Sequence, residues 1–246
     1  MKEWKKYKFD VNGFEIECEY SKEAIETIFL PLLNTLSEIQ RKKKNRIIVF
    51  IAAAPAVGKT TLSKFLEYLS TQIDGVTQIQ AIGLDGFHYH ADYIAEHTAV
   101  VNGKEVPMKD VKGCPETFDI DKLTVKLAAM KNEDVTWPVY DRNIHDVMED
   151  AENVTGEIVL IEGNWLLLNE GKWKDLKKVC DYSIFIRGEE HVLKDRLIQR
   201  KIQGGLSRQE AVKFYETSDC LNVKRALSHS LPADLELFMT EDNDYK

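Results

Sequence analysis

The chain has few of the residues that mark unusual architectures. Among its 246 residues it contains only 4 cysteines, 6 prolines and 13 glycines. The cysteines are scattered, with no C-x-x-C or cysteine–histidine spacing, so the sequence predicts neither a disulfide framework nor a structural metal. The low share of glycine and proline excludes a collagen-like chain, and no stretch rich in these residues divides the sequence into domains.

Long apolar runs and excess positive charge are also missing. No apolar run approaches the ~20 residues that cross a bilayer. The first ten residues, MKEWKKYKFD, lack the apolar core of a secretion signal, so we expect a cytoplasmic protein. The 33 lysines and arginines are outnumbered by 41 acidic residues, for a net charge of −8. This balance argues against nonspecific binding to nucleic acid or to an anionic membrane.

The composition that remains is that of a packed protein, with 43% hydrophobic and 30% charged residues. The length favours one domain over residues 1–246. Within it, residues 1–45 look like an N-terminal extension. Residues 7–20 alternate loosely around Asn12-Gly13, which favours a hairpin, and Ser21 can cap a helix that runs toward Gln40.

Apolar runs alternate with helical patterns over the rest of the chain. A buried parallel strand reads as a short run of β-branched and other apolar residues, whereas a covering helix has a period of 3.6. Strands are predicted at 47–51, 79–84, 157–161 and 182–186, and helices at 60–69, 119–131, 189–203 and 207–227. Such alternation predicts an α/β fold with a parallel sheet flanked by helices on both faces.

A phosphate-binding sequence follows the first of these strands. Residues 53–60, AAPAVGKT, match the pattern G-x-x-x-x-G-K-[ST] except at Ala53. In such a loop the backbone N–H groups bind phosphate oxygens, the lysine reaches the β- and γ-phosphates and the hydroxyl binds Mg²⁺. These roles fall to Gly58, Lys59 and Thr60. The other predicted nucleotide-binding residues are Ala54, Pro55, Ala56, Val57 and Thr61.

Two acidic residues follow other predicted strands. Ligands of a parallel sheet bind beyond the carboxyl ends of its strands, so both Asp85 and Glu162 are expected near the loop. Glu162 is predicted to hold the metal ion. Asp85 is a candidate base that accepts a proton from a phosphoryl acceptor. An Asp-Gly pair is also a common turn, and the local sequence leaves that reading open.

Five ordered motifs together resemble a known superfamily. They are the phosphate loop, LDGFH at 84–88, GCPETFD at 113–119, PVYDR at 138–142 with His145, and LIEGNW at 160–165. Over about residues 46–240 the chain is similar to phosphoribulokinases, uridine kinases and bacterial pantothenate kinases. It is especially similar to the nucleoside/nucleotide-kinase-like branch labelled as sugar or fructose-transport kinases.

The resemblance implies the three-layer fold of P-loop NTPases, with ATP and Mg²⁺ as cosubstrates and a small-molecule hydroxyl as acceptor. It implies that Asp85 is the base and that Tyr140 and His145 contact the acceptor. His88 is a further candidate for the acceptor pocket, with a packed wall as the alternative. Arg142 departs from the family pattern; it could bind an anionic group of the acceptor or pair with a neighbouring aspartate. Residues 113–119 resemble pantothenate kinases and the Tyr140–His145 spacing resembles uridine kinases, so the acceptor stays open between a sugar, a nucleoside and a pantothenate-like molecule.

The resemblance further implies a helical lid over about residues 187–206. Arg196 and Arg200 are four residues apart and project from one helix face. In the family such arginines reach the phosphates and act in catalysis with the loop lysine, here Lys59. The sequence leaves the oligomeric state open, and a homodimer is compatible with it.

Two competing hypotheses come from other classes. Asp110-Val111-Lys112-Gly113 fits the D-x-x-G of a nucleotide-dependent switch, but the chain has no N-K-x-D guanine-reading motif. A degenerate kinase that binds ligand without turnover would explain Ala53, since alanine adopts positive φ less easily than glycine.

Overall fold

The structure is a computed structural model that describes residues 2–11, 14–101 and 103–246. Its centre is a sheet of five parallel strands, which confirms the predicted α/β fold. The strand order is β11 (Leu235–Phe238), β10 (Tyr182–Arg187), β3 (Ile47–Ala53), β9 (Ile158–Gly163) and β4 (Ile79–Gly83). Four of these strands were predicted; β11 was missed because it is only four residues long.

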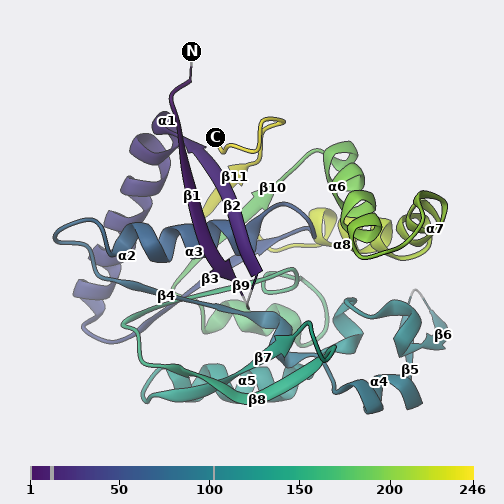
Figure 1. The fold of residues 1–246 in the computed structure, drawn as a ribbon. Coiled ribbons are helices and arrows are strands. Elements are labelled where there is room, and N and C mark those ends of the chain that lie inside the picture. The colour runs from purple at the N-terminus through teal and green to yellow at the C-terminus, as the bar shows by residue number, and fades with distance from the viewer. Residues whose placement is uncertain (1, 12–13, 102) are drawn as a thin grey trace.

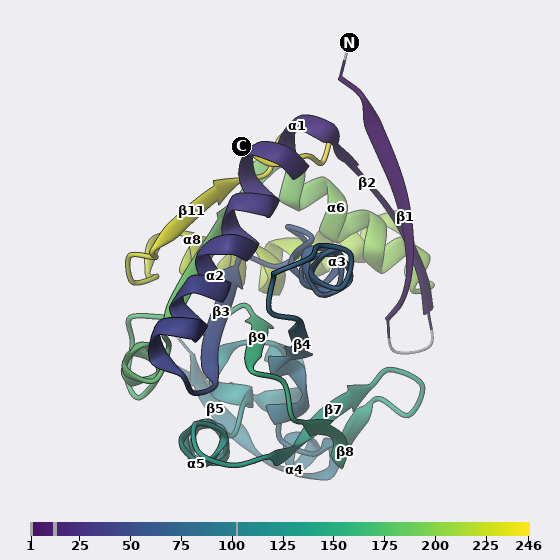
Figure 2. The same cartoon turned by 90° about the vertical axis from the view of Figure 1, so that its left-hand side faces the viewer.

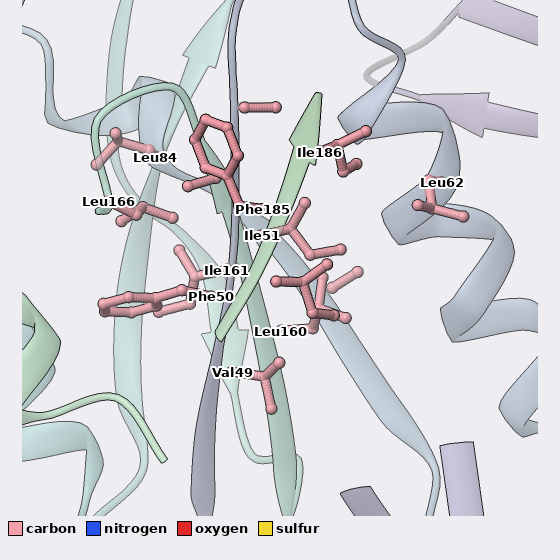
Figure 3. Packing of buried hydrophobic residues seen from close by; sticks show 14 of the residues in the cluster. Val49, Phe50, Ile51, Leu62, Leu84, Leu160, Ile161, Leu166, Phe185 and Ile186 are labelled. Atoms are coloured by element: carbon pink, nitrogen blue, oxygen red, sulfur yellow. The ribbon is translucent and has the colours of Figure 1, made fainter. Parts of the chain in front are cut away.

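The side chains of the middle strand β3 alternate between two apolar layers. All seven of its residues are buried. Figure 3 shows Val49 and Ile51 on the side of Leu62 from α3 (Lys59–Ser70), and Phe50 on the opposite side with Leu84 and Leu166. Each buried side chain of this size stabilises the fold by about 1.5–3 kcal/mol. Burial on both faces explains why this strand was recognisable as a continuous apolar run.

One face of the sheet is covered by α3 and by a helix that starts at Ser21. The Ser21 hydroxyl accepts a hydrogen bond from Ala24 N at 3.0 Å, as the sequence predicts for an N-cap. The helix continues through α1 (Lys22–Ala24), a π-helical turn (Ile25–Phe29) and α2 (Leu30–Lys43). A second group of helices packs together on the right of Figure 1. It consists of α6 (Glu190–Gln203), α7 (Arg208–Phe214), a π-helical turn (Tyr215–Asp219) and α8 (Cys220–Ser228).

The N-terminal hairpin packs against α3. Its strands β1 (Trp4–Val11) and β2 (Phe14–Ser21) are antiparallel, and the predicted Asn12-Gly13 turn lies outside the described residues. The Tyr7 and Tyr20 rings lie 4.8 and 4.4 Å from the Phe65 ring. Figure 2 shows α3 between this hairpin and α2. The hairpin therefore extends the hydrophobic core that surrounds α3.

The connection between β4 and β9, residues 84–157, forms the lower part of Figure 1. Of its elements the sequence predicted only the helix α5 (Ile120–Met130), whose N-cap Asp119 accepts a hydrogen bond from Lys122 N. The elements are η2 (Leu84–Phe87), α4 (Ala91–Glu96), β5 (Thr98–Val101), β6 (Lys104–Pro107), η3 (Met108–Val111), η4 (Pro115–Thr117), α5 (Ile120–Met130), β7 (Val135–Asp141) and β8 (Asp146–Val154), and a further short helix, η5 (Trp173–Lys178), follows β9. No helix in the described part of the chain is long and apolar enough to cross a membrane.

Candidate active site

The phosphate loop connects β3 to the first turn of α3. Ala53 still belongs to β3 and pairs with Ile186, so its backbone is that of an ordinary strand. The positive φ angles occur later, at Ala56 (67°) and Gly58 (94°). Ala53 therefore needs no positive φ, because the strand extends to residue 53, two residues beyond its predicted end. The degenerate-kinase hypothesis loses its only support from the sequence.

Three predicted residues meet where α3 begins. The Thr60 hydroxyl donates a hydrogen bond to Glu162 Oε1 at 2.8 Å, and Lys59 Nζ lies 3.8 Å from Glu162 Oε2. Glu162 is the penultimate residue of β9, next to β3, and its side chain is buried. Burial raises the pKa of Glu162, the nearby Asp85 charge acts in the same direction, and the Lys59 ammonium opposes both. The buried carboxylate is therefore short of compensating positive charge.

The donor set suits a magnesium ion. Among the described residues, no three His, Cys, Asp or Glu side chains gather into a metal-binding group. A cation beside the loop would thus take one hydroxyl and one carboxylate oxygen from Thr60 and Glu162. Mg²⁺ is commonly bound in this way, by one or two protein oxygens together with phosphates and waters.

Asp85 lies in a cavity of about 70 Å³ that Thr60 and Glu162 also line. We call it the carboxylate cavity. Its other walls come from the end of β4, from Gly86 and from Tyr140 and Arg142 at the β7–β8 turn. Asp85 stands in the first turn of η2, directly after β4, with an exposed side chain. The structure thus brings together the proposed metal ligands and the proposed base, as the strand-end argument predicts.

The position of Asp85 is fixed by close packing of β7 against η2. A Cβ atom added at Gly86 would overlap the Pro138 carbonyl and lie 2.8 Å from Val139 N. Trp137 donates a hydrogen bond from Nε1 to Gly83 O at 2.8 Å, and its ring packs edge-on against Phe87 at 4.6 Å. The glycine after Asp85 is therefore required by the approach of a second backbone, not only by a turn.

The β7–β8 hairpin carries the predicted acceptor contacts. Tyr140 lines the carboxylate cavity, and its hydroxyl accepts a hydrogen bond from Lys112 Nζ at 2.8 Å. The His145 side chain is exposed; its backbone carbonyl accepts a longer bond of 3.4 Å from Lys112. Lys112 was not predicted as a site residue, because no local pattern relates it to a tyrosine 28 positions away.

Arg142 lines the carboxylate cavity, and its positive charge lowers the pKa of Glu162 against the larger effect of burial. The alternative pairing with Asp141 or Asp146 does not occur among the described residues: Asp141 accepts from Asn143 N, and Asp146 faces His90 and the Ala91 and Val147 amides. The guanidinium thus pairs with neither aspartate among the described residues.

His88 is placed beside the cavity and not in its wall. Its ring packs on Phe118 with centroids 3.8 Å apart, and Nδ1 contacts the Asp85 carbonyl oxygen at 2.9 Å. Burial lowers the pKa of His88, which favours the neutral ring. The predicted contact of His88 with the acceptor stays a prediction. Its contact with the Asp85 carbonyl oxygen supports the backbone of Asp85.

The two predicted lid arginines have different surroundings. Arg196 donates a hydrogen bond to Ala56 O at 2.8 Å and a second one to Asn243 Oδ1. It lines a second cavity of about 430 Å³, the hairpin cavity, with Val57, Gly58 and Thr61. Arg200 is exposed and lines neither cavity, so its role stays a prediction. Asn243 was missed because the C-terminal residues carry no motif.

The D-x-x-G sequence of the switch hypothesis, residues 110–113, lines neither of the two cavities beside the phosphate loop. Asp110 is exposed in η3, and Gly113 follows it in a turn where its carbonyl accepts a hydrogen bond from Trp165 Nε1. The strand next to β3 that carries an acid is β9, with Glu162. The structure therefore offers no switch geometry at Asp110.

A phosphate loop at the end of a central parallel strand, with an acid on the adjacent strand, defines the P-loop class of nucleotide-binding proteins. No protein-family model matches the chain. It is 43% identical over 241 residues to the uncharacterized protein YggC of Escherichia coli, covering 98% of each chain. It is 26% identical to a "putative uridine kinase" of Schizosaccharomyces pombe, covering 80% of this chain and 84% of that one.

A solved structure described as a "putative fructose transport system kinase" from Silicibacter sp. TM1040 is also similar. It matches with a TM-score of 0.75 and 31% identity, over 85% of this chain and 98% of that one. The chain belongs to the P-loop kinases related to uridine kinase and pantothenate kinase. It is a phosphotransferase of the small-molecule kinase type, which confirms the predicted superfamily.

Proposed function

We propose that this kinase transfers the γ-phosphoryl group of Mg·ATP to a hydroxyl that a small-molecule acceptor places in the carboxylate cavity. The observation that supports it most is that Thr60, Glu162 and Asp85 line this one cavity. The loop amides and Lys59 would bind the phosphates, and Thr60 and Glu162 would hold Mg²⁺. The bound cation would offset negative charge on the phosphates and on the buried carboxylate.

In the chemical step, the Asp85 carboxylate accepts the proton of the acceptor hydroxyl. The acceptor oxygen forms a bond to the γ-phosphorus while the bond from that phosphorus to the β–γ bridging oxygen breaks, and ADP leaves. Asp85 is exposed toward the cavity and fixed by its own backbone packing, so it can orient the hydroxyl without rearrangement. Arg196 lies next to Gly58 and would reach a phosphate oxygen by exchanging its bond to Ala56 O.

The acceptor is proposed from the classes that the relatives' names and the cavity suggest: a sugar, a nucleoside or a pantothenate-like molecule. Arg142 lines the cavity and the Lys112 ammonium bonds to Tyr140 in its wall. Lys64, which also lines the cavity, is paired with Glu67 at 2.9 Å, whereas Arg142 and Lys112 have no carboxylate partner among the described residues. This favours members of these classes that carry an anionic group near the reacting hydroxyl.

The test is an acceptor panel assayed for phosphorylated product and for ADP, with wild-type protein, Asp85→Asn and the control Asp74→Asn. Asp74 is exposed in the loop after α3 and lines neither cavity. We expect Asp85→Asn to lower kcat on the order of 10²- to 10⁴-fold with ATP binding retained, as for the loss of a general base. The control should match the wild type.

Full acceptor phosphorylation by Asp85→Asn would remove the proposed base. Nucleotide hydrolysis that is stimulated by a protein, with no acceptor consumed from the panel, would instead favour the switch hypothesis.

A further inference from the structure

The hairpin cavity is a second cavity beside the phosphate loop, and it shares no lining residue with the carboxylate cavity. Its walls are Val57, Gly58 and Thr61 of the loop and α3, Arg196 of α6, and Met239, Asn243 and Tyr245 near the C-terminus. The remaining wall consists of residues 6–8 of β1 and 17–20 of β2. Its volume of about 430 Å³ is within the range of small-molecule sites.

The start of α3 separates the two cavities. Thr60 and Thr61 are consecutive, and successive residues of a helix point about 100° apart because a turn holds 3.6 residues. Thr60 accordingly lines the carboxylate cavity and Thr61 lines the hairpin cavity. If the proposed function holds, the γ-phosphate of ATP points toward Asp85. The nucleoside at the opposite end of the triphosphate then extends toward the hairpin cavity.

The hairpin is a fixed wall of this cavity. Tyr7 and Tyr20 pack on Phe65 of α3, and Tyr20 lies 6.0 Å from the buried Tyr245 ring. Lys2 pairs with Asp242 at 2.9 Å, which ties the start of β1 to the C-terminal segment. These contacts hold both chain ends against the loop, so the wall does not depend on the ligand for its position.

We infer that the β1–β2 hairpin is part of the nucleotide site and forms one wall of the pocket for the base and ribose of ATP. It lies outside residues 46–240, the part of the chain that carries the kinase motifs, and so it would be an addition to the phosphate-binding machinery. Because it touches only the nucleoside end, it sets the affinity for the base and ribose and leaves binding of the triphosphate unchanged. This inference rests on the proposed function.

The test compares two probes, Mg·ATP and Mg·tripolyphosphate, by titration calorimetry on the full-length chain. Cys18→Trp fills the cavity from the hairpin side, because Cys18 is half-buried and lines it. We expect this variant to weaken ATP binding roughly tenfold or more, about 1.4 kcal/mol, with tripolyphosphate affinity within twofold of the wild type. Lys5→Trp is the control: Lys5 is exposed on β1, the other strand of the hairpin, and does not line the cavity.

Unchanged ATP affinity in Cys18→Trp would overturn the inference. If that variant loses both ligands, Glu19→Trp decides, since Glu19 is an exposed position of the same wall and its replacement spares the core. Selective loss of ATP there supports the inference, and unchanged ATP affinity refutes it. Failure of the proposed function gives a different result, because the acceptor panel would then yield no phosphorylated product with the wild type, whatever the calorimetry shows for the two probes.

Discussion

The two cavities beside the phosphate loop differ in how their walls are built. The carboxylate cavity is narrow, at about 70 Å³, and its walls are held by contacts between backbones, as at Gly86, and by the buried Glu162. The hairpin cavity is about six times larger and is bounded in part by exposed Lys–Glu pairs such as Lys8–Glu17.

The two cavities are therefore suited to different tasks, one to positioning reacting groups and the other to binding a nucleoside. Transfer of a phosphoryl group requires the reacting oxygen, the base and the metal ligands to be positioned within a fraction of an ångström, and close backbone packing supplies that positioning. Binding a nucleoside requires mainly shape and contact area, which exposed strands at the chain ends can supply. Substitutions in the carboxylate cavity and in the hairpin cavity should therefore have different effects.

The largest effect is expected at Gly86 in the carboxylate cavity. Gly86→Ala places a methyl group against the Pro138 carbonyl, and neither backbone can swing aside. We expect the free energy of unfolding to fall by about 3 kcal/mol or more, at the upper end of overpacking effects. Chemical denaturation measures this loss.

The control for Gly86→Ala is Gly204→Ala at the end of α6, where the added Cβ would lie 3.4 Å from Lys201 O. That contact is ordinary, so stability should change by less than about 0.5 kcal/mol. Equal stabilities for the two variants would show that the carboxylate cavity is not rigid.

The sequence predicted the parts of the site that follow buried strands. Lys59, Thr60, Asp85 and Glu162 were expected to lie together because carboxyl ends of parallel strands meet at one edge of the sheet, and they do so; their roles stay predictions. Ala53 was misjudged because a motif cannot show where β3 ends; pairing with Ile186 extends the strand through it.

Other parts could not be read from local patterns. The β7–β8 hairpin was missed because Pro138 interrupts β7 and β8 is mostly exposed and acidic, which removes the alternation of a half-buried strand. Lys112 and Asn243 reach the site through contacts that span 28 and 47 residues along the chain. Only tertiary packing brings such pairs together.

A smaller effect is expected for Arg142, which lines the carboxylate cavity where the acceptor is proposed to react. Arg142→Met keeps an unbranched, largely aliphatic side chain and removes the guanidinium with its charge. If the acceptor is anionic, its KM should rise about 10- to 100-fold, the range for a lost charged hydrogen bond, while the KM for ATP stays within twofold. Steady-state kinetics with each substrate varied in turn measures both constants.

Arg41→Met is the matched control for Arg142, because Arg41 is exposed on α2 and lines neither cavity. Parallel increases in both KM values for Arg142→Met would mean that the guanidinium does not distinguish the two ends of the site. An unchanged KM for the acceptor would show that the acceptor has no anionic group at this position.

The smallest effect on stability is expected for the ion pairs that attach the β4–β9 connection to α8. Arg225 of α8 contacts Glu116 at 2.7 Å and Glu170 at 2.6 Å, and Glu170 also contacts His229 Nδ1 at 2.7 Å. Since Glu116 belongs to the β4–β9 connection, this network fixes that connection to α8. The hydrogen bond from Arg225 lowers the pKa of Glu170.

A carboxylate with a lowered pKa stabilises the fold above its ordinary value, here 4.5, and loses that contribution as the pH falls through the pKa of the folded state. Glu170→Gln should therefore cost about 0.5–1 kcal/mol at neutral pH, the size of a partly exposed pair. The deficit relative to wild type should shrink below 4.5, because the wild type then loses the pair too. Urea denaturation at both pH values, with the exposed Glu38→Gln as control, measures it. A deficit independent of pH would assign the role of Glu170 to packing instead of charge.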